Sequence, residues 1–300
     1  MPCSRTWLKL LAIGWLLLVQ AVPSEAGILG KSQGASSKSD SMEANIAEVQ
    51  RALDEQRYVD ANRLLDALAL AGAADPRLIL LAGELDLARD HYAAALGAFE
   101  RASADPGVRA AALQGQGLAL SMLGRSDKAL IILQQAVAAD PKAWRAWNAL
   151  GAEYDLRQDW AGAAQAYDQA IAASGGAAIV LNNRGYSRLL QHRPDEAAPD
   201  FVAALQKKPD LAAARTNLRL ALAMKGDYVR ATAAGVSDDE ATLLNNAGFA
   251  AALRGDYAKA KELLDRAMKA RSEYYGRASE NLDVVRGLSA REKGGSDAVQ

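Results

Sequence analysis

Small and apolar residues recur at fixed intervals between residues 144 and 175, and their spacing predicts a pair of helices. Counted from Trp144 as position 1, positions 4, 7, 8, 11, 20, 24 and 27 are occupied by Trp147, Leu150, Gly151, Tyr154, Ala163, Tyr167 and Ala170. Steps of three or four residues place such side chains on one stripe of each helix. Gly151 and Ala163 are small, which lets two antiparallel helices approach closely where they cross.

The same pattern returns every 34 residues along most of the chain. Position 8 is glycine at Gly83, Gly117, Gly151 and Gly185, and position 20 is alanine at Ala61, Ala95, Ala129, Ala163, Ala197 and Ala231. Gly248 and Ala260 continue both series after a shorter step of 29 residues. We therefore expect repeats that begin near residues 42, 76, 110, 144, 178, 212 and 241.

A helix pair in 34 residues with this spacing is the pattern of the tetratricopeptide repeat. The sequence thus predicts an all-α tetratricopeptide repeat solenoid over residues 42–287, with six to seven helix pairs. A final helix near 277–288 is expected to cover the open edge of the seventh repeat. Aromatic residues make up only 6% of the chain, which suits closely packed helices and argues against a core built on sheets.

The sixth repeat departs from the pattern. Arg219 stands at position 8 in place of glycine, and its second helix, starting near Tyr228, meets Gly235 within about two turns. Ser237 and Glu240 have the spacing of a capping box, which predicts that the next helix begins at once. We expect a short second helix here and a hinge over residues 235–239.

The two ends of the chain have a different composition. Residues 1–26 have the form of a secretory signal peptide: Arg5 and Lys9 precede an apolar run over 10–22, and small residues stand at −3 and −1 of a cut before Gly27. An uncleaved membrane anchor is the alternative, although the run is short for a bilayer span. Residues 27–41 are predicted to be a flexible linker and 288–300 a disordered tail.

Catalytic and metal-binding motifs are absent from the sequence. It has no H-E-x-x-H, G-x-S-x-G, Walker loop or C-x-x-C, and its one cysteine, Cys3, lies in the signal segment. His91 and His192 fall in turns between paired helices, where solvated residues are expected. A formal net charge of −1 gives no basic surface for nucleic acid. We predict a non-enzymatic protein with no cofactor, metal or small-molecule substrate.

In tetratricopeptide arrays the first helix of each repeat lines a concave face, and positions 2, 5, 9, 12 and 13 commonly meet a bound peptide. That resemblance gives a candidate groove made of Gln114, Arg145, Asn148, Asp155, Asn182, Tyr186, Thr216, Leu220, Asn245 and Phe249. Amides at position 5 can donate to and accept from an extended peptide backbone, and aromatic rings beside them can hold side chains. A structural role for these amides is the alternative. Asn183, Asn217 and Asn246, at position 6, belong to the general repeat pattern and are expected to be structural.

The C-terminal third carries paired Asn-Asn-x-Gly-Tyr/Phe segments at 182–186 and 245–249 and a Tyr-Tyr pair at 274–275. With the repeats from residue 110 onward, these segments resemble the TadD family of the tight-adherence (Flp) pilus assembly system of bacteria. The resemblance implies a scaffold in the periplasm or at the outer membrane that binds a pilus or secretin component and reaches the membrane only through that partner. Many members are lipoproteins, whereas this chain has no lipid-acceptor cysteine after its apolar run. A general periplasmic chaperone or adaptor and a regulatory subunit of a cell-wall enzyme remain alternatives.

Overall fold

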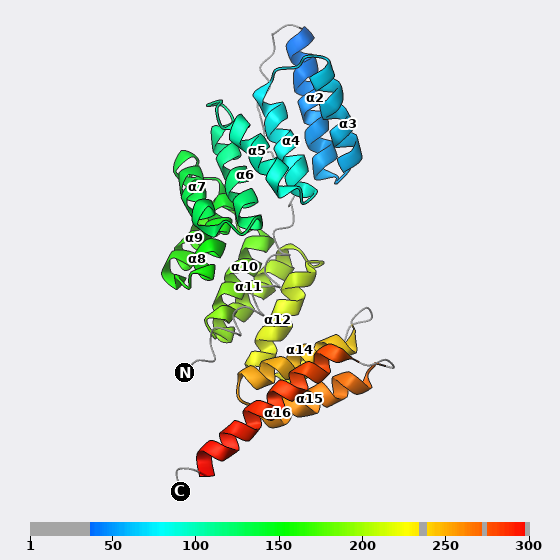
Figure 1. Ribbon diagram of the computed structural model, residues 1–300, viewed down its shortest axis with the longest axis vertical. Helices are drawn as coiled ribbons and strands as arrows, with labels where there is room; N and C mark the ends of the chain where they lie inside the picture. Colours follow the sequence, from blue (N-terminus) through cyan, green and yellow to red (C-terminus); the bar gives the residue numbers. More distant parts are fainter. Residues whose placement is uncertain (1–36, 234–238, 272–274, 298–300) are drawn as a thin grey trace. The chain divides into compact units, whose positions relative to one another are not determined.

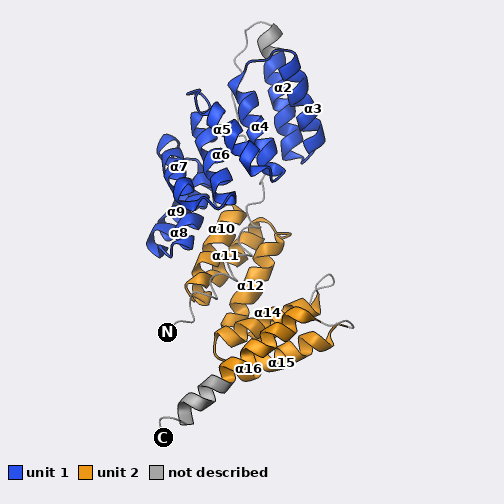
Figure 2. Ribbon diagram, in the orientation of Figure 1, with its two compact units in different colours: residues 1–176 blue, residues 177–300 orange. Residues whose placement is uncertain are grey.

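The computed structural model describes residues 37–233, 239–271 and 275–297, and in these ranges the chain forms helices joined by turns (Figure 1). The chain divides into two compact units, Met1–Gly176 and Ala177–Gln300, each of which is described by itself (Figure 2). The expected all-α solenoid of tetratricopeptide helix pairs is confirmed within both units.

The described part of unit 1 consists of four helix pairs. Its helices are α2 (Ser37–Asp54), α3 (Tyr58–Leu70), α4 (Pro76–Ala88), α5 (Tyr92–Ala102), α6 (Arg109–Met122), α7 (Ser126–Ala139), α8 (Trp144–Leu156) and α9 (Trp160–Ser174). Each first helix packs on its own second helix and also on the first helix of the next pair. This nearest-neighbour packing is what defines a solenoid.

Unit 2 continues the pattern but contains one incomplete pair. Its described helices are α10 (Ala178–Leu190), α11 (Pro194–Lys207), α12 (Ala212–Met224), α13 (Tyr228–Ala231), α14 (Glu240–Leu253), α15 (Tyr257–Lys269) and α16 (Gly276–Asp297). The short second helix expected in the sixth repeat is confirmed, because α13 has only 4 residues. As in the other repeats, the first helix α12 packs on the next first helix, α14.

The recurring spacing of small and large residues is explained by one contact, which is made in the five pairs that have glycine at position 8. The glycine at position 8 of the first helix faces the large residue at position 24 of the second. A Cβ built on Gly151 would lie 2.7 Å from the Tyr167 ring, and one on Gly185 would lie 2.7 Å from the Phe201 ring. The alanines at position 20 are fully buried as well, since Ala95, Ala129, Ala163, Ala197 and Ala260 have no exposed surface.

The turn between the two helices of a pair has one recurring backbone feature. In all seven pairs the residue at position 15 has a positive φ, at Gln56, Asp90, Gly124, Gln158, His192, Gly226 and Gly255. Four of these residues are not glycine, so the short turn imposes a left-handed conformation on ordinary side chains. His192 therefore closes a turn, as the sequence predicts, with φ at 57°.

Two expected boundaries of the solenoid are wrong. Helix α2 begins at Ser37, so residues 37–41, expected as the end of the linker, are helical. Helix α16 runs to Asp297, whereas a disordered tail was expected from 288. A formed helix extends at little cost through polar residues, and the Ala290–Lys293 segment consists of strong helix formers. The polar composition of residues 37–41 and 288–297 therefore does not mark the ends of helices α2 and α16.

The expected capping box before the seventh repeat is also wrong. Helix α14 starts at Glu240, and its N-cap is Asp239, whose side chain accepts a hydrogen bond from the Ala241 backbone N–H at 3.2 Å. The carboxylate also accepts a hydrogen bond from the Thr242 hydroxyl at 2.6 Å. Apart from Asp239, the hinge expected over 235–239 lies outside the described residues, as do the signal segment and residues 27–36 of the linker.

Candidate protein-binding face

Two of the amides expected to face a peptide groove are instead buried between helices. The exposed fraction is 0% for Asn182 and 2% for Asn245. The Asn217 side-chain amide donates to Asn182 Oδ1 at 3.0 Å, and the Asn281 amide donates to Asn245 Oδ1 at 2.9 Å. The expectation that these two position-5 residues form an open binding row is therefore wrong, and the structural alternative holds for them.

These contacts form an amide ladder in which position 5 of one first helix accepts from position 6 of the next. Asn281 lies in α16, so this helix docks on α14 as the first helix of a further repeat would. Thr216 replaces asparagine at position 5 of α12, and its side chain is exposed. There, Thr216 and Asn246 line a hollow of about 10 Å³ instead of bonding to each other. The amide ladder is thus interrupted at the repeat with the short second helix.

Other members of the expected groove differ in their surroundings. Asp155 is 4% exposed, and its carboxylate accepts a hydrogen bond from the Tyr167 hydroxyl at 2.9 Å, so it supports the α8–α9 pair. Burial raises the pKa of Tyr167 well above its usual range. Tyr186 is 6% exposed, whereas Leu220 and Phe249 are half-buried. In unit 2 the expected row therefore presents mainly apolar and aromatic surface together with Thr216.

The other three expected groove residues of unit 1 are half-buried. Gln114 on α6 and Asn148 on α8 are both half-buried. Arg145, also on α8, stacks its guanidinium over the Trp144 ring at 5.3 Å from the ring centre. Burial lowers the pKa of Arg145, and the negative charges of Glu84 and Asp54 oppose this change.

A charge group that includes Arg145 joins three first helices of unit 1. Glu84 on α4 and Asp54 on α2 both interact electrostatically with Arg145 on α8. Burial raises the pKa of Glu84 to about 6, the positive charge of Arg145 opposes this rise, and the negative charge of Asp54 adds to it. The charges on α2, α4 and α8 therefore influence one another, and we call the surface formed by the first helices of unit 1 the first-helix face.

Sequence reasoning missed Glu84 and Asp54. They occupy positions 9 and 13 of the repeats that begin near 76 and 42. The candidate groove begins only at residue 110 and therefore leaves them out. The repeat register, applied to the first two repeats, places both carboxylates on this face.

We expect Glu84→Gln to raise stability at neutral pH and to have little effect in acid. The folded pKa of Glu84, about 6, lies above its ordinary value of 4.5, so folding favours the protonated form. Below pH 4.5 the carboxyl is neutral in both states, and the wild type loses stability as pH rises to 6. The difference should reach about 1–2 kcal/mol at pH 7.5. Urea unfolding at pH 4.5 and 7.5 measures it. A variant less stable than wild type at both pH values would show that pairing with Arg145 outweighs burial.

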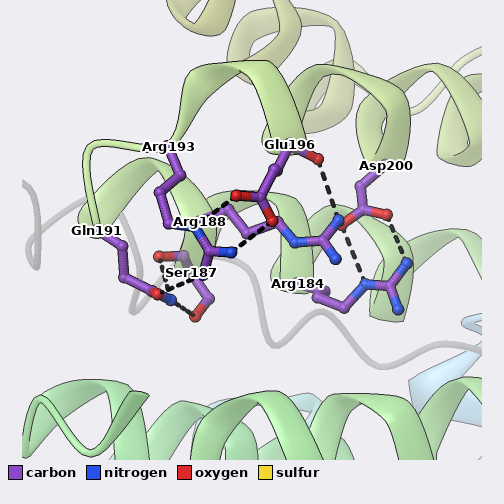
Figure 3. Close-up of polar contacts among 7 residues, drawn as sticks. All are labelled: Arg184, Ser187, Arg188, Gln191, Arg193, Glu196 and Asp200. Atoms are coloured by element: carbon purple, nitrogen blue, oxygen red, sulfur yellow. Dashed lines mark hydrogen bonds and ion pairs between the residues drawn. The ribbon is translucent and has the colours of Figure 1, made fainter. Parts of the chain in front are cut away.

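A second charged cluster is buried between α10 and α11 in unit 2 (Figure 3). Asp200, 4% exposed, accepts hydrogen bonds from Arg184 at 3.0 and 2.6 Å and from Arg188 at 2.6 Å. Arg188 also donates to the Glu196 carbonyl oxygen at 3.0 Å. The partners belong to the two helices of one pair, so this cluster joins α10 to α11.

The described residues offer no sign of metal or membrane chemistry. No group of three or more His, Cys, Asp and Glu side chains in the described ranges is placed to hold a metal ion. Among the same residues, no helix has both the length and the apolar character needed to cross a bilayer.

Comparison with known proteins supports the fold and little beyond it. No protein-family model matches the sequence. The heat-shock protein cognate co-chaperone sgt12 of Aspergillus fumigatus is 31% identical over 118 residues, which cover 38% of this chain and 34% of that protein. The chain thus spans about a third of the length of this relative.

Three solved structures have a similar arrangement of helices. A chain of the APC/C hetero-tetramer Cut9-Hcn1 aligns with a TM-score of 0.63 at 16% identity, over 80% of this chain and 48% of that one. A tetratricopeptide repeat protein from Parabacteroides merdae aligns with a TM-score of 0.52 at 17% identity, over 82% of this chain and 99% of that one. TTC0263, a thermophilic tetratricopeptide protein of Thermus thermophilus, aligns with a TM-score of 0.54 at 19% identity, over 60% of this chain and 98% of that one. The chain is therefore a tetratricopeptide repeat protein by fold.

Proposed function

We propose that this chain is a non-catalytic scaffold that binds an extended segment of a partner protein on the first-helix face of unit 1. The observation that carries the proposal is the half-buried, charged Arg145 at the start of α8, on which the charges of Asp54 on α2 and Glu84 on α4 act. The half-buried amides Gln114 and Asn148 add hydrogen-bonding groups there. Such mixed polar and charged surfaces can fix the register of a bound peptide.

The proposal places the protein in the bacterial envelope. Support comes from the signal-peptide pattern of residues 1–26, with its cut before Gly27 and no lipid-acceptor cysteine. The resemblance to TadD supports a component of a Flp-type pilus or its secretin as the partner. An intact mass of the periplasmic form that starts at Gly27 and carries no lipid is the expected result; a full-length, membrane-bound species would contradict it.

A chaperone or adaptor for several client proteins is the second candidate. The observation that favours it is the co-chaperone relative that is 31% identical over 118 residues. A single dominant pilus component in captures from envelope extracts would favour the scaffold, whereas many unrelated clients would favour the chaperone.

The decisive experiment removes three side chains of the first-helix face in unit 1. We expect Gln114→Ala, Arg145→Ala and Asn148→Ala together to lower affinity for the captured partner by about tenfold to a hundredfold, since each lost hydrogen bond costs about 1 kcal/mol. Binding of the purified partner can be measured by calorimetry. A charge-matched control replaces exposed Arg101, Gln165 and Gln169.

The control should bind as the wild type does. Undiminished binding by the folded first-helix variant would refute the proposed surface. Asn182→Ala provides a further comparison, because loss of its buried amide should destabilise unit 2 without altering partner choice.

A further inference from the structure

We propose that unit 1 carries a second docking site, on α5, α6 and α7, which receives one apolar side chain from an acidic segment of a partner protein. The site, called here the outer hollow, has a volume of about 220 Å³. Its lining residues come from α5, α6 and α7 and from the turn before α7: Leu96, Glu100, Gln116, Leu120, Arg125, Lys128, Ile131 and Ile132. Its residues differ from those of the first-helix face, so it is a separate surface.

The walls and floor of the outer hollow are mainly apolar. Leu96 on α5 and Ile132 on α7 line it together with Leu120 on α6. Ile131 is 55% exposed, although β-branched apolar side chains of this size are mostly buried in folded proteins. Gln116 is 7% exposed, and one N–H of its side-chain amide donates to the Phe99 carbonyl oxygen at 3.1 Å. The hollow therefore suits an apolar side chain rather than a polar one.

The charged residues at the rim of the outer hollow indicate which residues should flank the inserted side chain. Arg125 and Lys128 are exposed, and Glu100 is the one carboxylate among the lining residues. Within the described part of the chain, the charged groups of Arg125 and Lys128 form no ion pair or hydrogen bond. Two unpaired cations against one carboxylate favour acidic residues beside the inserted side chain.

The size of the outer hollow points to a side chain and not to a free small molecule. Ligand pockets usually enclose about 300–1,000 Å³, which is more than this hollow offers. A leucine, methionine or phenylalanine side chain fits such a space while its main chain passes over the rim. One buried anchor surrounded by a polar rim is the usual energetic centre of a protein interface.

Fluorescence anisotropy with three labelled nonapeptides tests this site on the full chain. The probe has a central phenylalanine flanked by glutamate and serine, one control has a central alanine, and the other has lysine in place of glutamate. We expect the probe to bind at least about tenfold more tightly than either control. Equal binding of the acidic and basic peptides, or of the alanine control, would overturn the proposal.

Substitutions then locate the binding. Ile131→Asp should weaken binding of the probe by about tenfold or more, because it removes apolar contact surface and places a negative charge against an acidic peptide. The matched control is Val59→Asp on α3, where the side chain is 85% exposed and distant in sequence from the hollow. Lys128→Glu should shift preference toward the lysine peptide. If both Ile131→Asp and Lys128→Glu bind the probe peptide as tightly as the wild type does, the proposal is refuted.

Isoleucine methyl NMR on the wild-type chain keeps the test independent of variant stability. Addition of the probe should shift the methyl signals of Ile131 and Ile132 and leave that of Ile46, on first helix α2, unchanged. Shifts at Ile46 alone would assign the peptide to the first-helix face and contradict the outer hollow. Self-association of the chain that Ile131→Asp abolishes, without probe binding, would identify a second copy as the occupant and also contradict it.

Discussion

Asp200→Ala is expected to lower the free energy of unfolding by about 3–5 kcal/mol, the usual cost of removing one partner from a buried ion pair. The Asp200 side chain is 5% exposed, and the side chains of Arg184 and Arg188 are 23% and 26% exposed. Without the carboxylate, two guanidinium groups remain close together and partly desolvated between α10 and α11. Urea unfolding followed by circular dichroism measures the loss.

Glu196→Ala in the same cluster is the matched control. Its carboxylate pairs with Arg193 at 2.6 Å, but the two side chains are 47% and 50% exposed (Figure 3). Exposed pairs contribute about 0–1 kcal/mol, so this variant should unfold close to the wild type. Equal losses in Asp200→Ala and Glu196→Ala would show that burial of the cluster does not govern its contribution.

Gly151→Leu is expected to destabilise the protein by about 1–3 kcal/mol or more, because a packed contact cannot absorb a large side chain without shifting. Even the first carbon of that side chain would lie 2.7 Å from two ring atoms of Tyr167. Tyr167 has no exposed surface and is held through its hydroxyl by Asp155, so the ring has little freedom to move away. Thermal and urea unfolding both report the change.

A pair of alanine substitutions separates this steric effect from helix propensity. Gly151→Ala should destabilise, whereas Gly97→Ala should stabilise by about 0.5–1 kcal/mol, the usual gain for alanine over glycine inside a helix. A Cβ at Gly97 meets only the end of the Arg101 side chain, at 3.7 Å. Stabilisation by both substitutions would mean that α8 and α9 are less tightly packed than their contact at Tyr167 indicates.

The helix pairs themselves could be predicted from the sequence alone. Helices α4, α6, α8, α10, α12 and α14 begin within one residue of the expected repeat starts. Small residues at positions 8 and 20 let two helices cross closely, so the same residue types recur in most repeats. Gly151 faces the Tyr167 ring, and Ala163 is fully buried. The step of 29 residues between the sixth and seventh repeats, five fewer than the usual 34, likewise predicted the short α13.

The surroundings of the position-5 amides and of Glu84 were decided only by the tertiary structure. Side chains at adjacent helix positions point about 100° apart. When position 6 faces the neighbouring helix, position 5 therefore lies near the edge between that contact and the open face. A small rotation of the helix moves Asn182 from one to the other, and its partner Asn217 lies 35 residues away. Likewise, the link of Glu84 to Arg145 depends on how three helices stack.

Sequence periodicity thus determined which residues pair within a repeat, because that contact is local and repeats identically. Packing between repeats determined burial, charge pairing and pKa, because these depend on distances between helices that no single repeat contains. The contact of Gly151 and the burial of Ala163 lie within a repeat and follow from the sequence pattern. The amide ladder and the electrostatic link of Glu84 to Arg145 lie between repeats and required the tertiary structure.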